Sequence, residues 1–378
     1  MKHHFILSLS VLAASGGPLL AQTAEIEPET LTVEERISEG NHIYVMDMGI
    51  SGPSAIAVLN ADDLSMEGNM GSGTFSQMLM SPGAESLFTG SVYFKRFTRG
   101  PIEAVIEEFD PTTLSVKREI VVSDKMAQTL TQRGALNRSA DGNYLIVQNA
   151  TPATSVNIVD LAAGKDLVEV PTPGCWTAYP ALEGLAFTTI CGDGTIVKYT
   201  VSADGTASAP GRSEPMFDAD TSPIFGNAVR ADGLLVYVSY AGKLLMVDDS
   251  GEVPVLSRTV DFAVDDWAPG GYNLMAYHAP SKTLFVMMHS GVSDGSHKAP
   301  AEEIWAIDLA SDKVVGRSPA KGESNIAVSA GETPQLVGVD HLGGVHVYDV
   351  TLGETVSLTP GPSREGVAIF AMMIATDY

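Results

Sequence analysis

A short strand-like segment recurs seven times along this chain. The clearest copy is residues 154–160, Thr-Ser-Val-Asn-Ile-Val-Asp, where apolar and polar residues alternate before a turn at residues 161–164. Alternation with a period of two is typical of a β-strand that buries one face. Six similar segments recur at intervals suited to one propeller blade each: residues 54–60, 103–110, 194–200, 242–248, 302–308 and 343–349. The repeat predicts an all-β fold, a seven-bladed β-propeller.

Each repeat reads as four strands, here called a, b, c and d. The third repeat shows all four, at residues 134–140, 143–149, 154–160 and 165–171. The first repeat lacks strand a, whereas the chain ends with an additional strand-like segment at residues 366–372. We expect the C-terminal strand to complete the first blade and close the ring, because closure removes the exposed edges of an open array.

The N-terminus has the pattern of an export signal. Lys2 is followed by an apolar run over residues 5–14 and by small residues, which predicts a signal peptide over residues 1–21, with cleavage after Ala21 or, alternatively, Ala24. The run is too short to span a bilayer, and a buried N-terminal helix is the alternative. We expect an N-terminal extension over residues 22–40, the propeller over residues 41–378, and a periplasmic location.

Two cysteines are present, Cys175 and Cys191. They fall in consecutive strand-like segments, and an oxidising compartment favours a disulfide between them. A loop of this length would stabilise the fold by roughly 3 kcal/mol. Redox or metal use is the alternative, but the pair lacks close C-x-x-C spacing and an attached histidine cluster.

The charge balance argues against one class of partner. The formal net charge is −24, with only 22 lysines and arginines in 378 residues. Nucleic-acid binding requires clustered basic residues that neutralise phosphates. We therefore expect no nucleic-acid partner and attribute the acidity to solubility.

The long connections all fall between strands b and c or between strand d and the next strand a. In an antiparallel propeller these connections share one face, so that face carries nearly all the elaboration. Because binding usually depends on loops held by a rigid scaffold, we assign the partner or substrate to it. The long connections are residues 95–102, 123–133, 213–224, 258–270 and 290–301.

Catalytic patterns are scarce. The sequence has no G-x-S-x-G, H-E-x-x-H, phosphate-binding glycine loop or C-x-x-C-H motif. His289, His297 and Asp294 flank one long loop, but their spacing does not converge them on a metal. Asp265 and Asp266 lie beside a tryptophan and are better interpreted as exposed loop carboxylates than as an acid/base pair. By motif alone the chain is a binding scaffold.

Several segments nevertheless resemble the heavy chain of the quinoprotein amine dehydrogenases. Their amino-acid sequences are more similar to the aralkylamine branch than to the methylamine branch. Arg99-Gly100 and residues 109–114 are also similar to that family. The main matching segments are residues 148–155 (Gln-Asn-Ala-Thr-Pro-Ala-Thr-Ser), 174–176 (Gly-Cys-Trp), 189–194 (Thr-Ile-Cys-Gly-Asp-Gly), 267–274 (Trp-Ala-Pro-Gly-Gly-Tyr-Asn-Leu) and 297–305 (His-Lys-Ala-Pro-Ala-Glu-Glu-Ile-Trp).

The resemblance implies a seven-bladed propeller with a disulfide and without a cofactor or catalytic residue of its own. It implies a small light chain carrying tryptophan tryptophylquinone, two heavy and two light chains, oxidation of primary amines to aldehydes, and electron transfer to a cupredoxin of the azurin or amicyanin type. In the family a phenylalanine of the first b–c loop lines the substrate channel. The matching position is Ile50, followed by the small residues 51–53, so we expect Ile50 at an altered channel entrance.

Two other functions remain open. One is a stand-alone periplasmic propeller that binds a ligand or an envelope protein without catalysis. The other is a lactonase-like hydrolase, which would need metal-binding carboxylates and histidines around the central tunnel, a pattern that cannot be placed in this sequence.

Overall fold

The computed structural model describes residues 34–378, and the compact unit runs from Arg36 to Tyr378. The predicted signal peptide and most of the predicted extension lie outside the described residues. The described end of the extension contacts the first two blades, because the Ile37 N–H donates to Thr112 O at 2.9 Å and the Ser38 hydroxyl to Glu67 at 2.8 Å. Among residues 34–378 no helix is long and apolar enough to cross a membrane.

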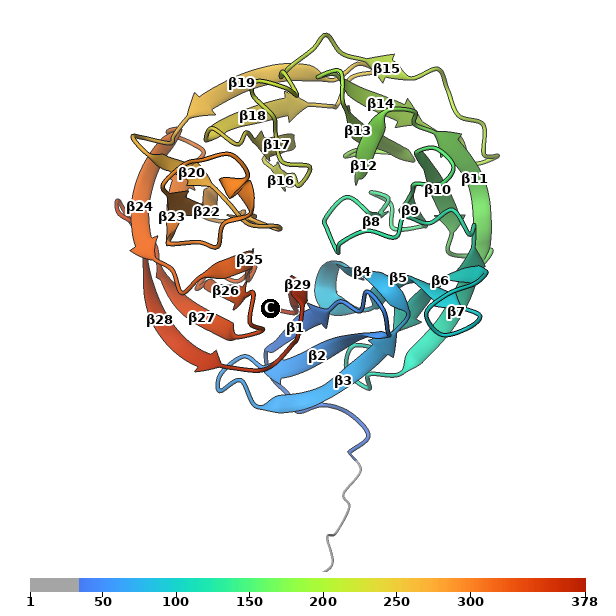
Figure 1. Ribbon diagram of the computed structural model, residues 1–378, viewed down its shortest axis with the longest axis horizontal. Helices are drawn as coiled ribbons and strands as arrows, with labels where there is room; N and C mark the ends of the chain where they lie inside the picture. Colours follow the sequence, from blue (N-terminus) through green and yellow to red (C-terminus); the bar gives the residue numbers. More distant parts are fainter. Residues whose placement is uncertain (1–33) are drawn as a thin grey trace, which may run out of the picture. The chain divides into compact units, whose positions relative to one another are not determined.

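Seven antiparallel sheets surround a central channel, which confirms the predicted seven-bladed β-propeller (Figure 1). The strands of blades 1 to 4, in spatial order from the channel outwards, are β29 (Ala371–Thr376), β1 (His42–Asp47), β2 (Ser54–Asn60), β3 (Met66–Ser72); β4 (Thr74–Met80), β5 (Leu87–Phe94), β6 (Ile102–Phe109), β7 (Val116–Val122); β8 (Leu136–Arg138), β9 (Tyr144–Asn149), β10 (Ser155–Asp160), β11 (Lys165–Pro171); β12 (Cys175–Pro180), β13 (Ala186–Cys191), β14 (Ile196–Thr200) and β15 (Gly211–Arg212).

The other three blades follow the same order, except that the innermost strand of blade 6 is divided into two pieces that both pair with β22. The strands are β16 (Val229–Ala231), β17 (Leu234–Val238), β18 (Lys243–Asp248), β19 (Val255–Asp261); β20 (Trp267–Pro269), β21 (Met275–His278), β22 (Thr283–Ser290), β23 (Glu303–Asp308), β24 (Lys313–Pro319); β25 (Glu323–Val328), β26 (Gln335–Asp340), β27 (Val345–Thr351) and β28 (Ser357–Arg364). Two short 3-10 helices, η1 (Pro82–Ala84) and η2 (Ser296–Lys298), lie in connections.

The C-terminal strand closes the ring as expected. β29 pairs antiparallel with β1, with Val45 opposite Ile374. The strand begins at Ala371 rather than at residue 366, because residues 366–370 form the connection from blade 7 instead. Asp377 then accepts hydrogen bonds from the backbone N–H of His42 at 2.7 Å and from its ring at 2.9 Å.

One interpretation of the repeat was wrong. Alternation predicted strands with one buried face, but in β10 the polar residues Ser155 and Asn157 are as buried as their apolar neighbours. The reason is that each blade is covered on both faces by the adjacent blades. Alternating exposure appears in outermost strands such as β3 and β7.

Amide side chains at the inner strands join one blade to another. Each donates a hydrogen bond to a backbone carbonyl of a different blade or of the connection that leads into it, so the blades are held by polar contacts in addition to apolar packing. The pairs are Gln77 to Thr129 O, Asn137 to Ala178 O, Asn227 to Tyr272 O, Asn273 to Met372 O and Asn325 to Ala371 O.

Candidate functional site on the loop face

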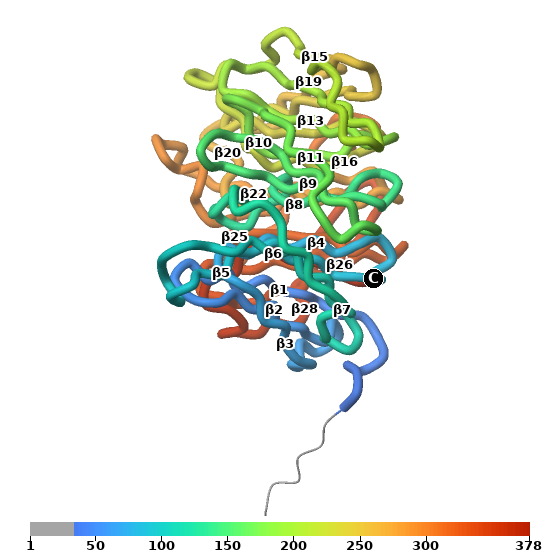
Figure 2. Tube along the Cα trace, turned by 90° about the vertical axis from the view of Figure 1, so that its right-hand side faces the viewer, coloured from blue at the N-terminus to red at the C-terminus, as the bar shows by residue number. Residues whose placement is uncertain are grey.

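The two faces of the ring carry different connections. We call the side with the b–c and d–a connections the loop face and the side with the a–b and c–d connections the turn face. In the edge-on view of Figure 2 the loop that follows β5 protrudes on the side opposite to the C-terminus. The predicted long loops all belong to the loop face, but the turn face has one long connection that was not predicted, at residues 201–210 between β14 and β15.

The loop face also carries most of the exposed large apolar side chains that lie in connections of the described chain. On the turn face only Leu182 and Val253 are of this kind. The six on the loop face occupy blades 6, 7, 1 and 2, which are consecutive around the ring (Figure 1). We call them the apolar arc; its residues are Val264, Val292, Leu342, Ile369, Ile50 and Phe97. Exposed apolar side chains that gather on one face of a molecule suit a surface that a partner covers.

Ile50 lies at the centre of the apolar arc. It is 53% exposed and lines a shallow pocket of about 390 Å³ together with Ile369, which is 89% exposed, and Phe370. The structure therefore places the predicted channel residue Ile50 on the open rim of a groove at the junction of the first blade and the C-terminal connection.

Backbone hydrogen bonds hold this groove in place. The Asp47 carboxylate accepts the N–H groups of Ile369 at 3.0 Å and Phe370 at 2.7 Å, and the Met48 N–H donates to Phe370 O at 3.0 Å. Gly49 is packed so closely that a Cβ there would lie 2.2 Å from the carbonyl oxygen of Gly52. The Ile50 loop is therefore a fixed part of the surface.

Ile369 was missed at the level of sequence. The sequence predicts a strand over residues 366–372, and this prediction hides the fact that Ile369 lies in an exposed connection. Gly366, which has φ +68°, marks the point where the chain leaves the strand path. That glycine was the available signal for a connection rather than a strand.

A polar cluster shapes the turn that carries Leu342. Asp340 accepts the N–H groups of Leu342 at 2.7 Å and Gly344 at 3.0 Å, and it lies 3.1 Å from the His346 ring. Burial acts to raise the pKa of Asp340, but these hydrogen bonds outweigh it and hold the pKa below its ordinary value. The Val367 N–H donates to Gly343 O at 3.0 Å, which packs the turn against the segment that bears Ile369.

The structure does not assemble a metal site from the histidines of the sixth blade. Among residues 34–378 no group of three or more His, Cys, Asp or Glu side chains is placed to hold an ion. His289 is buried, with Nδ1 2.9 Å from Ser290 O. His297 instead stacks on Tyr240, with ring centroids 4.4 Å apart, and burial, followed by the charge of Lys298, lowers its pKa.

The carboxylates Asp265 and Asp266 are exposed, as expected. Asp266 accepts the N–H of Val292 at 3.1 Å, which ties together the two loops that carry Val264 and Val292. This hydrogen bond gives Asp266 a structural role in the apolar arc. Among the described residues, Asp266 lines none of the pockets in which an acid/base pair could act.

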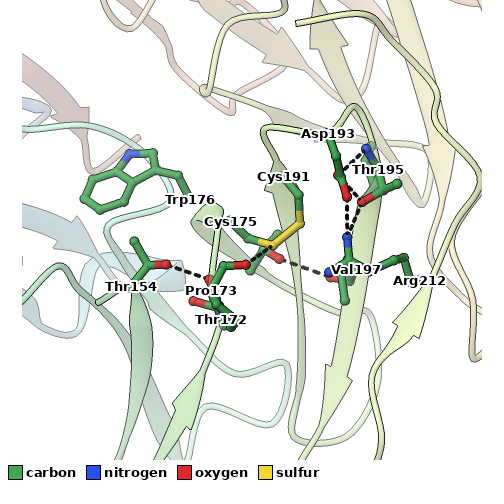
Figure 3. Close-up of a disulfide and its surroundings, with 12 residues drawn as sticks. Thr154, Thr172, Pro173, Cys175, Trp176, Cys191, Asp193, Thr195, Val197 and Arg212 are labelled. Atoms are coloured by element: carbon green, nitrogen blue, oxygen red, sulfur yellow. Dashed lines mark hydrogen bonds and ion pairs between the residues drawn. A yellow bond between two sulfur atoms is a disulfide. The ribbon is translucent and has the colours of Figure 1, made fainter. Parts of the chain in front are cut away.

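Cys175 and Cys191 form the expected disulfide (Figure 3). They are directly paired positions of β12 and β13, with Cα atoms 3.9 Å apart, at the loop-face end of blade 4. Beside them Arg212 donates to Asp193 at 3.0 Å and to Thr195 at 2.6 Å, so the turn after Cys191 is fixed from both sides. Trp176 points away from the disulfide.

Comparison with known sequences gives one family. Residues 39–358 match the profile of "methylamine dehydrogenase heavy chain (MADH)". The chain is 23% identical over 358 residues to the methylamine dehydrogenase heavy chain of Methylophilus methylotrophus, with 92% of this chain and 87% of the relative covered. It is 24% identical over 316 residues to the protein of the same name from Methylorubrum extorquens, with 80% and 76% covered.

Comparison with solved structures gives the fold alone. A 6-phosphogluconolactonase candidate from Bacteroides fragilis superposes with a TM-score of 0.61 at 12% identity, over 92% of this chain and 99% of that one. A functionally unknown protein from Desulfotomaculum acetoxidans gives a TM-score of 0.56 at 11% identity, over 85% and 99%. At such identities, shared architecture carries no information about activity.

Proposed function

This chain belongs to the methylamine dehydrogenase heavy chain family, and from that premise we propose that it is the heavy subunit of a periplasmic quinoprotein amine dehydrogenase. The observation that carries the proposal beyond family membership is the one-sided apolar arc, which a smaller light chain would cover. In this role the heavy subunit supports the reaction without performing its bond-making steps.

The groove at Ile50 fits a covering role. Its only charged side chain is Asp47, and both oxygens of that carboxylate are already engaged by backbone N–H groups. The groove therefore offers an incoming amine mainly apolar contact, and its one carboxylate is held in place by backbone N–H groups. In the assembly, tryptophan tryptophylquinone on the light chain would supply the electrophilic carbonyl that accepts the amine's electrons. Ile50 and Ile369 would narrow the path to it and exclude water.

We extend the proposal to aralkylamines as the preferred substrates, on the resemblance of the matching segments to the aromatic branch of the quinoprotein heavy chains. Short alkylamines are the competing class, because the curated relatives are named methylamine dehydrogenase heavy chains. The proposal also includes a cupredoxin of the azurin or amicyanin type as the electron acceptor and an assembly of two heavy and two light chains.

Purification of the protein from its own host tests the pairing. We expect it to emerge with a small, cysteine-rich chain that has quinone absorbance, and the complex to oxidise primary amines. Leu342→Asp in the apolar arc should release the light chain, because the aspartate would be desolvated at the interface without a partner. Leu182→Asp is the matched control on the turn face and should leave the complex intact. Equal retention of the small chain by both variants would contradict the assignment of the loop face.

Ile50→Phe tests the entrance. If Ile50 lines the substrate path, the larger ring will alter the relative kcat/KM for short and aromatic amines in the assembled complex. The change should be roughly tenfold or more, because a difference of one methylene in a pocket is worth about 1–3 kcal/mol. The measurement is a set of initial rates over a series of alkylamines and arylalkylamines. Identical relative rates for the native and variant complexes would remove Ile50 from the path.

A stand-alone binding propeller is the second candidate function, favoured by the lack of catalytic patterns in the sequence. It would be supported by a colourless single polypeptide from the native host that oxidises no amine.

A further inference from the structure

The central channel forms a second cavity, remote from the apolar arc. It has a volume of about 460 Å³ and is lined by residues of all seven innermost strands. The inner strands run from the loop face to the turn face, and the lining includes their last residues, such as Met80, Val328 and Thr376, so the cavity opens on the turn face. Its volume falls in the range typical of small-molecule sites.

Arg133 closes this cavity on the side of the loop face. It precedes β8 of blade 3, yet its guanidinium donates to Met275 O of blade 6 and, at 3.1 Å, to Ile326 O of blade 7. Its backbone N–H donates to the Asn273 side chain at 3.2 Å. Arg133 thus spans the channel from one side to the other and forms the floor of the cavity.

The floor is cationic without a carboxylate to balance it. No aspartate or glutamate lines the cavity, although the chain has 46 acidic residues against 22 basic ones. The other lining arginine, Arg230, is neutralised by Asp249 at 2.6 Å. Arg133 has no ion-pair partner within 4 Å among the described residues. Asp232 also touches the lining, where it accepts from Tyr277 at 3.0 Å, but it is paired with Lys282 at 3.0 Å.

The walls above this cation are apolar. Methionine and aliphatic side chains from β4, β21, β25 and β29 make up most of them, including Met78, Met80, Val328, Met373 and Ile374. A guanidinium has five N–H donors, and backbone carbonyls engage the guanidinium of Arg133 at only two atoms, Nη1 and Nη2. The remaining donors suit a planar anion, since arginine binds carboxylates through paired, charge-assisted hydrogen bonds.

We propose that the turn-face end of the central channel binds a small amphipathic monocarboxylate, with the carboxylate on Arg133 and the aliphatic tail along the methionine-rich wall. This site is independent of the proposed amine dehydrogenase function. It requires neither a light chain nor the loop face. The ligand class follows from one cation, without a carboxylate partner among residues 34–378, at the end of a cavity whose walls are largely, though not entirely, apolar.

Titration calorimetry of the purified full-length mature chain with octanoate, octylamine and octanol tests the ligand class. Octanoate is expected to bind, and the amine and the alcohol to bind at least roughly tenfold more weakly because they lack the charge-assisted pair. Arg133→Gln should weaken octanoate binding by roughly tenfold or more. Arg99→Gln, an equal change of charge in an exposed loop of the other face, should leave the affinity unchanged. Absence of octanoate binding, or equal affinity in the two variants, would overturn the proposal.

The hydrogen bonds of Arg133 to Met275 O and Ile326 O also hold blades 6 and 7 to blade 3, so a test is needed that does not depend on the folding of the Arg133→Gln chain. Photolabelling of the wild-type chain with a diazirine-bearing aliphatic carboxylate provides a test that does not depend on the variant. The label is expected on peptides containing Met78 and Met373, and excess octanoate should compete it away. Labelling concentrated on the loop-face peptides that contain Phe97 or Leu342, or labelling insensitive to octanoate, would refute the channel site.

Discussion

Replacing Ile374 with aspartate is expected to lower the free energy of unfolding by roughly 4 kcal/mol or more. Ile374 lies in the closing strand β29, is 7% exposed and packs in the apolar cluster shared by blades 7 and 1, with Ile43 and Val337. The substitution removes an aliphatic side chain from that cluster and places a charge there. Because β29 is the strand that pairs with the inner edge of β1, loss of its packing also exposes that edge.

Ile369→Asp provides the control for this prediction. It makes the same chemical change five residues earlier, at a position that is 89% exposed, and should leave stability within about 0.5 kcal/mol. The measurement is urea unfolding of the unassembled heavy chain, monitored by tryptophan fluorescence. Similar midpoints for the Ile374→Asp and native chains would show that the ring does not depend on its C-terminal closure.

Asp249→Asn is expected to cost about 3–5 kcal/mol, because it breaks a buried ion pair and leaves the arginine without its counter-charge. The Asp249 side chain is fully buried and receives Arg230 at 2.6 and 3.1 Å and the Thr188 hydroxyl at 2.9 Å. Arg230 in turn donates to Pro180 O at 2.6 Å. The pair therefore fastens blade 5 to blade 4.

Asp261→Asn is the matched comparison within blade 5. Asp261 also forms an ion pair, with Lys243 at 3.4 Å, but its side chain is 76% exposed and the pair is screened by water. Thermal unfolding should show a large loss of Tm for Asp249→Asn and a change close to zero for Asp261→Asn. If the two variants lost equal stability, burial would not be the reason that the Asp249 pair matters.

The two faces of the ring offer different kinds of recognition. The loop face has a broad, exposed apolar arc, which suits a protein partner. The turn face has the mouth of a cavity in which one arginine, Arg133, lacks a carboxylate partner in the described part of the chain, and this suits a small anion. In both cases the propeller supplies rigidity, and the distinguishing side chains lie in connections or immediately before an inner strand rather than in the repeated strands.

Much of the architecture was predictable because it depends on local patterns. The repeat at residues 154–160 indicated the blade, the missing first strand indicated closure by the C-terminus, and Cys175 and Cys191 fell on neighbouring strands. The blade and the cysteine pairing depend on hairpins whose register is set by nearby turns, whereas the closure followed from the count of strands at the two ends. The exceptions were also local: residues 366–370 form a connection rather than a strand, and β15 is reduced to two residues after the long connection at residues 201–210.

The blade count, the cysteine pairing and the face with the long loops could be predicted from sequence, because hydrogen-bonded hairpins specify them over short distances. The closing strand pairs residues more than 300 positions apart and was predicted instead from the strand missing at the start and the additional strand at the end. The contacts of Ile50 and Ile369 in one groove, and of Arg133 with Met275 and Ile326 across the channel, were visible only in the folded ring. These residues are far apart in the chain. They meet only when seven blades close into a ring, and no local periodicity encodes which side chains then face one another.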